Sequence, residues 1–154
     1  MPADEPAIVA IGRELVADGT TYVFAPSTTD AELAAYWLSP AVTTFVAERA
    51  GDVVGCSILR ANHAGRGAHV ANASYAVAER ARGAGVGRAL AEHSLAEARR
   101  LGFTAMQFNF VVSTNEPAVA LWRALGFAIL GTLPGAFRHP RLGLVDAYVM
   151  HRVL

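Results

Sequence analysis

Apolar positions recur along the chain with two periods, one typical of helices and one typical of strands, and the breaks between them fall mostly at glycine or proline. Spacings of three and four residues indicate amphipathic helices, whereas short β-rich runs indicate strands. The predicted helices are 5–18, 30–38, 86–101 and 117–125, and the predicted strands are 20–25, 43–49, 52–59, 70–77, 105–112, 127–133 and 144–153.

Sequence signals mark the ends of several elements. Two helices finish in the pattern Arg-x-Leu-Gly-Phe, which places Gly102 and Gly126 just past the last leucine. A glycine there favours a left-handed closing residue, and the following phenylalanine opens a strand. Thr29 or Asp30 is expected to cap the second helix, and Pro40 is expected to end it.

The order of elements indicates a single domain over residues 1–154, built as one mixed sheet covered by helices. Ala50-Gly51 joins two β-rich runs and predicts a hairpin. The segment 134–143, PGAFRHPRLG, is interpreted as a loop before the last strand. If that last strand is exposed, it is an edge through which a homodimer could pair.

Composition narrows the function classes. Of 154 residues, 53% are apolar and 17% are charged, and the formal net charge is zero. All 13 basic residues are arginine, so Schiff-base chemistry and a nucleotide-binding P-loop lysine are excluded. No basic tract stands out, which argues against nucleic acid as a partner.

Cys56 is the only cysteine, so neither an internal disulfide nor a cysteine zinc site can form, and we expect a buried thiol in a reducing cytoplasm. No histidine pair has metal-ligand spacing on a helix, and we predict no metal site. The N-terminal residues 1–15 have the pattern of neither a signal peptide nor a membrane span.

The stretch Arg82-Gly83-Ala84-Gly85-Val86-Gly87 lies between a strand and a helix. Free N–H groups and the positive end of a helix dipole make such a junction an anion site, and glycines let a ligand approach the backbone. Arg82 and Arg88 supply charges that suit phosphate. The alternative is a glycine-rich turn that only packs tightly.

Two common phosphate motifs do not fit. A dinucleotide fingerprint that starts at Gly83 needs glycine at position 88, and a Walker loop needs Gly-Lys at 88–89, where Arg88-Ala89 stands. The hexapeptide instead resembles the R/Q-x-x-G-x-G/A signature of the GCN5-related N-acetyltransferase (GNAT) superfamily. Val77, five residues before Arg82, and the segment 115–127 also resemble that family's pattern, so the likeness covers roughly residues 70–130.

The resemblance implies an α+β fold with a single mixed, mostly antiparallel sheet of about six to seven strands flanked by helices. It also implies that acetyl-CoA is the cosubstrate. The edge of strand 70–77 would pair with the pantetheine arm near Tyr75 and Val77, with the Val77 amide as oxyanion donor. Asn115 would either contact the cofactor or simply cap the next helix. The diphosphate would bind the backbone of Arg82, Gly83, Ala84, Gly85, Val86 and Gly87, assisted by Arg88.

Acetyl transfer requires a neutral amine, donors for the oxyanion and a proton for the thiolate. Many GNAT members carry a carboxylate or histidine on the strand before the signature, whereas this strand offers Asn72 and no base. Asn109 interrupts an apolar run on the next strand. We predict that Asn72 and Asn109 orient the acceptor, as in a GNAT group acting on small amino acids; satisfying buried backbone is the alternative for each.

Trp122 stands where the family pattern has a tyrosine that is often assigned as the proton donor. An indole N–H donates a hydrogen bond but cannot deliver the proton, so Trp122 would stabilise the sulfur or only fill space. His63, His69 and His139 fall in segments expected to border the acceptor mouth, and one of them could be the missing base. Tyr36 and Trp37 are interpreted as core.

The sequence therefore predicts a cytoplasmic N-acetyltransferase that transfers acetyl from acetyl-CoA to a small-molecule amine, an amino acid or related compound, with no membrane partner. One alternative is a non-catalytic acyl-CoA-binding module on the same scaffold. Another is a phosphate-sensing domain unrelated to CoA.

Overall fold

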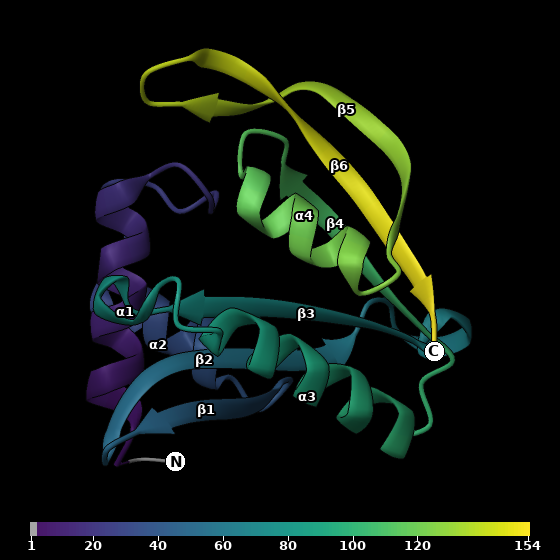
Figure 1. Ribbon diagram of the computed structural model, residues 1–154, viewed down its shortest axis with the longest axis horizontal. Coiled ribbons are helices and arrows are strands. Elements are labelled where there is room, and N and C mark those ends of the chain that lie inside the picture. Colours follow the sequence, from purple (N-terminus) through teal and green to yellow (C-terminus); the bar gives the residue numbers. More distant parts are fainter. Residues whose placement is uncertain (1–2) are drawn as a thin grey trace.

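The computed structural model describes residues 3–154, and its elements form a six-stranded mixed sheet with four α-helices (Figure 1). The strands lie in the order β1-β2-β3-β4-β6-β5, and only the β3–β4 pair is parallel. The α+β prediction is thereby confirmed. The elements are α1 (Glu5–Asp18), α2 (Asp30–Leu38), β1 (Thr43–Arg49), β2 (Asp52–Ala61), β3 (Val70–Val77), α3 (Val86–Arg100), β4 (Ala105–Val112), α4 (Glu116–Ala124), β5 (Ala128–His139) and β6 (Gly143–Val153).

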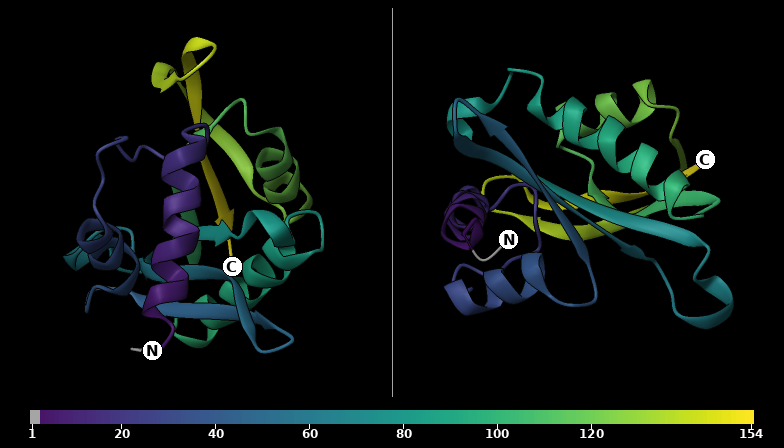
Figure 2. Two further views of the ribbon diagram at one scale, coloured as in Figure 1. Left: turned by 90° about the vertical axis from the view of Figure 1, so that its left-hand side faces the viewer. Right: turned by 90° about the horizontal axis from the view of Figure 1, so that it is seen from below.

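Helices cover both faces of the sheet. In the right-hand view of Figure 2, α3 and α4 lie on one side of the strands, and α1 and α2 lie on the other. Leu95 of α3 and Trp122 of α4 share one buried cluster with Phe108 of β4. Ile8 and Trp37 belong to a second cluster behind β2 and β3. Within the described residues, no helix combines the length and hydropathy needed to span a bilayer.

The sheet opens between β3 and β4. Their ladder consists of two residue pairs, Val70 with Ala105 and Ala71 with Met106. Beyond these pairs the strands diverge, and in Figure 1 both start near the C-terminus and run apart. Because strands that are not paired expose their N–H and C=O groups, the divergence creates two inner edges in the middle of the sheet. We call this opening the splay.

Several sequence-predicted boundaries are confirmed. The strands β3 and β4 have the predicted limits, α1 and α2 likewise, and Gly102 and Gly126 have positive φ angles of 86° and 83°. Three predictions are wrong. Residues 20–25 form no strand, and β5 continues through Pro134 to His139 instead of ending in a loop. The last strand, β6, lies between β4 and β5 and is not an edge, so β1 and β5 are the outer edges.

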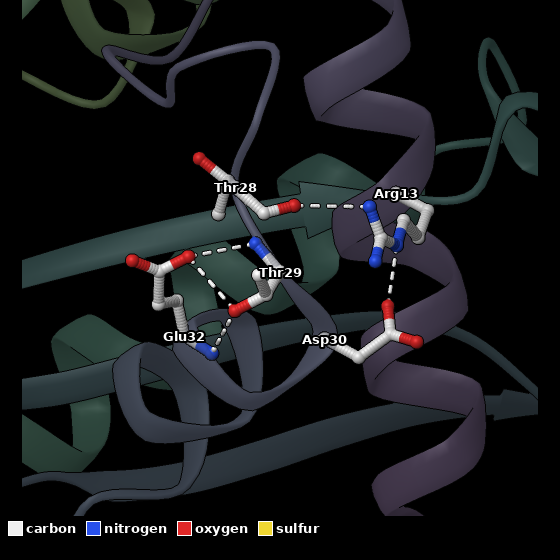
Figure 3. Close-up of polar contacts among 5 residues, drawn as sticks. All are labelled: Arg13, Thr28, Thr29, Asp30 and Glu32. Carbon is white, nitrogen blue, oxygen red and sulfur yellow. Dashed lines mark hydrogen bonds and ion pairs between the residues drawn. The ribbon is translucent and has the colours of Figure 1, made fainter.

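The start of α2 holds the preceding segment, residues 19–29, in place (Figure 3). The Thr29 hydroxyl accepts a hydrogen bond from the Glu32 amide, and the Glu32 carboxylate accepts one from the Thr29 amide, which is a capping box. Arg13 of α1 pairs with Asp30 and donates to the Thr28 carbonyl oxygen at 2.9 Å. These contacts fix the far end of a segment that carries part of the site.

Candidate functional site

The N-terminus of α3 is an open cradle of backbone N–H groups. Gly83 and Gly85 have φ angles of 76° and 82°, a left-handed conformation that other residues adopt at a cost. A Cβ built at either position would meet no atom within 4 Å, so nothing in the protein covers them. The first amide bonded within the helix is that of Ala89, to Gly85. The amides of residues 85–88 have no partner among residues 3–154.

Two arginines flank this cradle. Arg82 closes the short 3₁₀ turn before it, and Arg88 lies in the first turn of α3. Both side chains are exposed, and Arg88 forms an ion pair with Glu92 in the next turn of α3, at 3.4 Å. Four converging N–H groups, a helix dipole and two guanidinium groups suit a diphosphate. The chemistry and shape of the cradle therefore fit the phosphates of coenzyme A.

The cradle leads to a cavity of about 440 Å³ that occupies the splay. Gly87 lines it at the cradle end, and Trp122 lines it from α4. Residues from the opposite face of the sheet, including Tyr22 and Tyr36, line its other side. The cavity thus passes through the sheet, so ligands arriving from the two faces can meet inside it.

The backbone of β3 faces this cavity at alternate residues. The Tyr75 N–H and C=O point away from β2, because both bond to the hydroxyl of Tyr22, at 2.9 Å and 2.8 Å. By strand alternation, the Val77 N–H and C=O point into the same opening, two residues further on. Tyr22 therefore closes the inner edge at Tyr75 and leaves Val77 as the open position next to the cradle.

Replacing Tyr22 with phenylalanine is expected to lower the free energy of unfolding by about 1–3 kcal/mol, because the Tyr75 N–H and C=O lose their shared partner. Urea denaturation measures the change. Tyr148→Phe, on β6 away from this contact, is the control and should shift the free energy by less than half as much. Equal stability of Tyr22→Phe and the parent protein would show that water replaces the hydroxyl.

The two predicted asparagines line the same cavity but do not bond to each other. Asn72 is buried, and its Nδ2 donates to the Gln107 carbonyl oxygen at 2.9 Å, one residue beyond the last β3–β4 pair. Asn109 is exposed; its Nδ2 donates to Asn62 Oδ1 at 2.7 Å, and its Oδ1 accepts from Gln107. Asn72 thus bridges the two strands where the splay begins.

Comparison with known proteins identifies this architecture. The model of the acetyltransferase (GNAT) family matches residues 11–127. This chain belongs to the GNAT family. A GCN5-related N-acetyltransferase from Kribbella flavida is 48% identical, with a TM-score of 0.96 over 100% of this chain and 94% of that chain.

Two further relatives extend the GNAT comparison. A phosphinothricin acetyltransferase from Sinorhizobium meliloti, solved with acetyl-CoA, is 26% identical with a TM-score of 0.86, covering 100% of this chain and 85% of that chain. The N-acetyltransferase aca1 of Schizosaccharomyces pombe is 36% identical over 98 residues, which are 63% of this chain and 47% of that protein. The match spans about half the length of that curated relative. The fold and the relatives are those of acetyl-CoA-dependent N-acetyltransferases.

In this GNAT chain, Trp122 and Asn115 line the cavity from α4 and its N-cap. Trp122 is 8% exposed and packs against Tyr75 and Phe108, with ring centroids 4.9 Å and 4.7 Å apart. Asn115 caps α4 by accepting from the Ala118 amide at 3.4 Å, and it also lines the cavity. Asn115 thus both caps α4 and forms part of the cavity wall.

The side chains that line the cavity of this GNAT chain are mostly apolar, amide or hydroxyl groups. Among the described residues, its lining includes no carboxylate and no histidine. Burial raises the pKa of Tyr22, with Tyr36 adding to the effect, and burial also raises the pKa of Tyr75, so both phenols stay neutral. Cys56 lies outside the cavity lining; it is buried as predicted, and desolvation raises its pKa to about 12.

The loop histidines do not border the acceptor mouth, contrary to the sequence-based expectation. His63 and His69 are exposed away from the cavity lining. His139 ends β5, is buried, and its Nδ1 accepts hydrogen bonds from the amides of Arg141 and Leu142. Within residues 3–154, no three His, Cys, Asp or Glu side chains gather as a metal group.

Sequence reasoning missed the side of the cavity that α2, the segment before it and the facing residues of β2 and β3 build. Tyr36 was interpreted as core, yet its hydroxyl bonds Ser74 at 2.8 Å and lines the cavity. These residues are single polar or aromatic positions that belong to no sequence motif. The sequence therefore contains no signal that distinguishes them from residues that only pack. The missed lining residues are Thr21, Tyr22, Tyr36, Arg60 and Ser74.

Proposed function

We propose that this protein transfers an acetyl group from acetyl-CoA to the amine of a small molecule, an amino acid or a related compound. The observation that carries the proposal is the continuity of a free amide cradle, residues 85–88, with a cavity that passes through the splay. A diphosphate group and a reacting amine could then occupy opposite ends of one channel. The relative named for phosphinothricin, an amino-acid analogue, supports a small acceptor.

On the cofactor side, each group has a distinct task. When bound, acetyl-CoA supplies a thioester whose carbonyl carbon is activated toward amines. The free amides of residues 85–88 would hold the diphosphate, with Arg82 and Arg88 adding charge. The amides of Arg82 and Ala84, which were also expected to take part, instead donate to the carbonyl oxygens of Glu79 and Ala81. The Val77 N–H points into the splay and would donate to the oxygen that becomes negative during transfer. Tyr75 would line the channel without pairing with the pantetheine arm, because its N–H and C=O already bond to the Tyr22 hydroxyl.

On the acceptor side, Asn72 and Asn109 would orient the amine and its substituents. Neither titrates, so the amine must lose its proton to water before it attacks. Trp122 offers an indole N–H for the departing sulfur, and solvent would protonate the thiolate. The protein thus contributes positioning and oxyanion stabilisation, which bring the reacting atoms together in the right geometry.

Thiol release with a panel of amino acids tests this function, together with Asn72→Ala and Asn109→Ala. Asn109→Ala should raise the acceptor KM about tenfold and leave stability within ~0.5 kcal/mol, because its side chain is exposed. Asn72→Ala should also lower the free energy of unfolding by about 1–3 kcal/mol, because it removes a buried amide side chain and its hydrogen bond to the part-buried Gln107 carbonyl oxygen. Unchanged rates in both variants would remove both asparagines from the acceptor site.

The second candidate is a non-catalytic acyl-CoA-binding module, and the lack of a base in the cavity lining favours it. Such a module would raise its melting temperature with CoA but release no thiol with any amine. A phosphate-sensing domain would instead respond to inorganic phosphate and not to CoA. The same two measurements, thermal shift and thiol release, separate all three functions.

A further inference from the structure

The acceptor side of the cavity carries a single full charge. Arg60 is the one arginine in the lining, and among the described residues no acidic side chain joins it there. No carboxylate within residues 3–154 forms an ion pair with Arg60. Arg60 is exposed to solvent while it lines the cavity. A guanidinium keeps its charge at any pH that proteins tolerate, so this part of the cavity wall stays positively charged.

The position of Arg60 links it to the predicted acceptor groups. It lies on β2 directly opposite Asn72 on β3, so the two side chains share one face of the sheet. That face also carries Ser74, whose hydroxyl bonds Tyr36 of α2, and it is the face opposite the cradle on α3. The helices α1 and α2 cover it around Ile58 and Ala76, whereas Arg60 is exposed. Arg60 therefore lies on the side from which the acceptor, not the cofactor, would enter.

A second unsatisfied group lines the same side. The Thr21 hydroxyl is buried and has no hydrogen-bond partner among the described residues. Buried hydroxyls nearly always find a partner, so an orphan on a cavity wall marks a place where a ligand or water supplies one. Thr21 directly precedes Tyr22, whose hydroxyl bonds to the Tyr75 backbone. These hydrogen bonds therefore also hold Thr21 in position.

We propose that Arg60 binds a carboxylate of the acceptor, so that the substrates are small amines carrying a carboxylate next to the amino group. The proposal rests on the proposed function and names the chemical class that this site accepts. A guanidinium binds a carboxylate through two parallel hydrogen bonds, which fixes the orientation of the amine as well as its affinity. The same charge repels a protonated amine and favours the neutral form that reacts.

The test pairs each amino acid with its amide, which has the same amine and side chain but no carboxylate. Arg60→Gln should raise the KM of the amino acids by about 10- to 100-fold and change the KM of the amides by less than about twofold. Arg60→Lys should restore part of the loss. Arg66→Gln, in the exposed 3₁₀ turn, is the matched control. The affinity for CoA should stay the same in all variants.

A binding measurement separates this inference from the proposed function. Titration of an N-acetyl amino acid into the CoA-saturated protein should show affinity that Arg60→Gln lowers tenfold or more, whereas the corresponding N-acetyl amide should bind both proteins alike. Equal losses for acid and amide, or no loss for the acid, would overturn the role of Arg60. Carboxylate binding that depends on Arg60 without any turnover would instead refute the transferase and keep the carboxylate site.

Discussion

Replacing Gly85 with aspartate is expected to weaken CoA binding by about 100-fold or more. Gly85 begins α3 with a φ of 82°, and a Cβ there would project into the open space above the free amides. A carboxylate in that space would repel a diphosphate and could accept hydrogen bonds from the amides that would otherwise hold it. Calorimetric titration with CoA measures the change in affinity.

Gly85→Asn is the matched control, because asparagine has the same shape and tolerates the left-handed conformation about as well as aspartate. We expect it to weaken CoA binding about tenfold or less, since it covers the amides without adding charge. Any difference between the two variants then measures electrostatics alone. If both variants bind CoA as tightly as the parent protein, the diphosphate does not lie on these amides.

The rate of transfer is expected to increase about tenfold for each unit by which the pH is raised, up to the pKa of the acceptor amine. For an amine whose pKa lies above 9, this is a change of roughly 1000-fold between pH 6 and pH 9. The reason is that the described cavity lining has no carboxylate or histidine, and burial raises the pKa of Tyr22 and Tyr75 so that neither phenol ionises in this range. The neutral fraction of the amine is then the only quantity that changes. Profiles of kcat/KM against pH measure it.

Two acceptors with different amine pKa values provide the control. The pH at which each profile levels off should follow the pKa of its amine, because the described cavity lining contributes no carboxylate and no histidine. A bend at one fixed pH for every acceptor would reveal a base in the protein and contradict a cavity that acts by positioning alone.

The parts of the fold that could be predicted are those with strong local signals. The limits of β3 and β4 follow from β-rich runs bounded by turn residues, and the α3 cradle follows from three glycines at a strand–helix junction. The family resemblance rests on that stretch together with Val77 and the segment 115–127. The model and the comparisons confirm the fold and the family, while the roles of Asn72, Asn109 and Trp122 stay predictions.

The splay and the acceptor wall could not be predicted, because both depend on how distant segments pack. The sequence of β4 has the pattern of an ordinary strand, and nothing in it says that pairing with β3 stops after Met106. The segment around Tyr22 has strand-like composition, but its side chains serve an aromatic cluster with Phe24 and Tyr36 instead of a ladder. Pro134 led to the loop interpretation of β5, yet there it falls at an irregular stretch of an outer edge, where proline is tolerated.

The diverging strands β3 and β4 also affect solubility. Their facing edges carry unpaired N–H and C=O groups, which can pair with a strand of another molecule as an outer edge strand can. Tyr22 caps one position of this edge with its hydroxyl, and Val77 next to it stays uncovered. CoA bound in the splay would pair with the remaining backbone groups and would contact both β3 and β4. Preparations stripped of CoA should therefore self-associate faster on storage than preparations kept saturated with it.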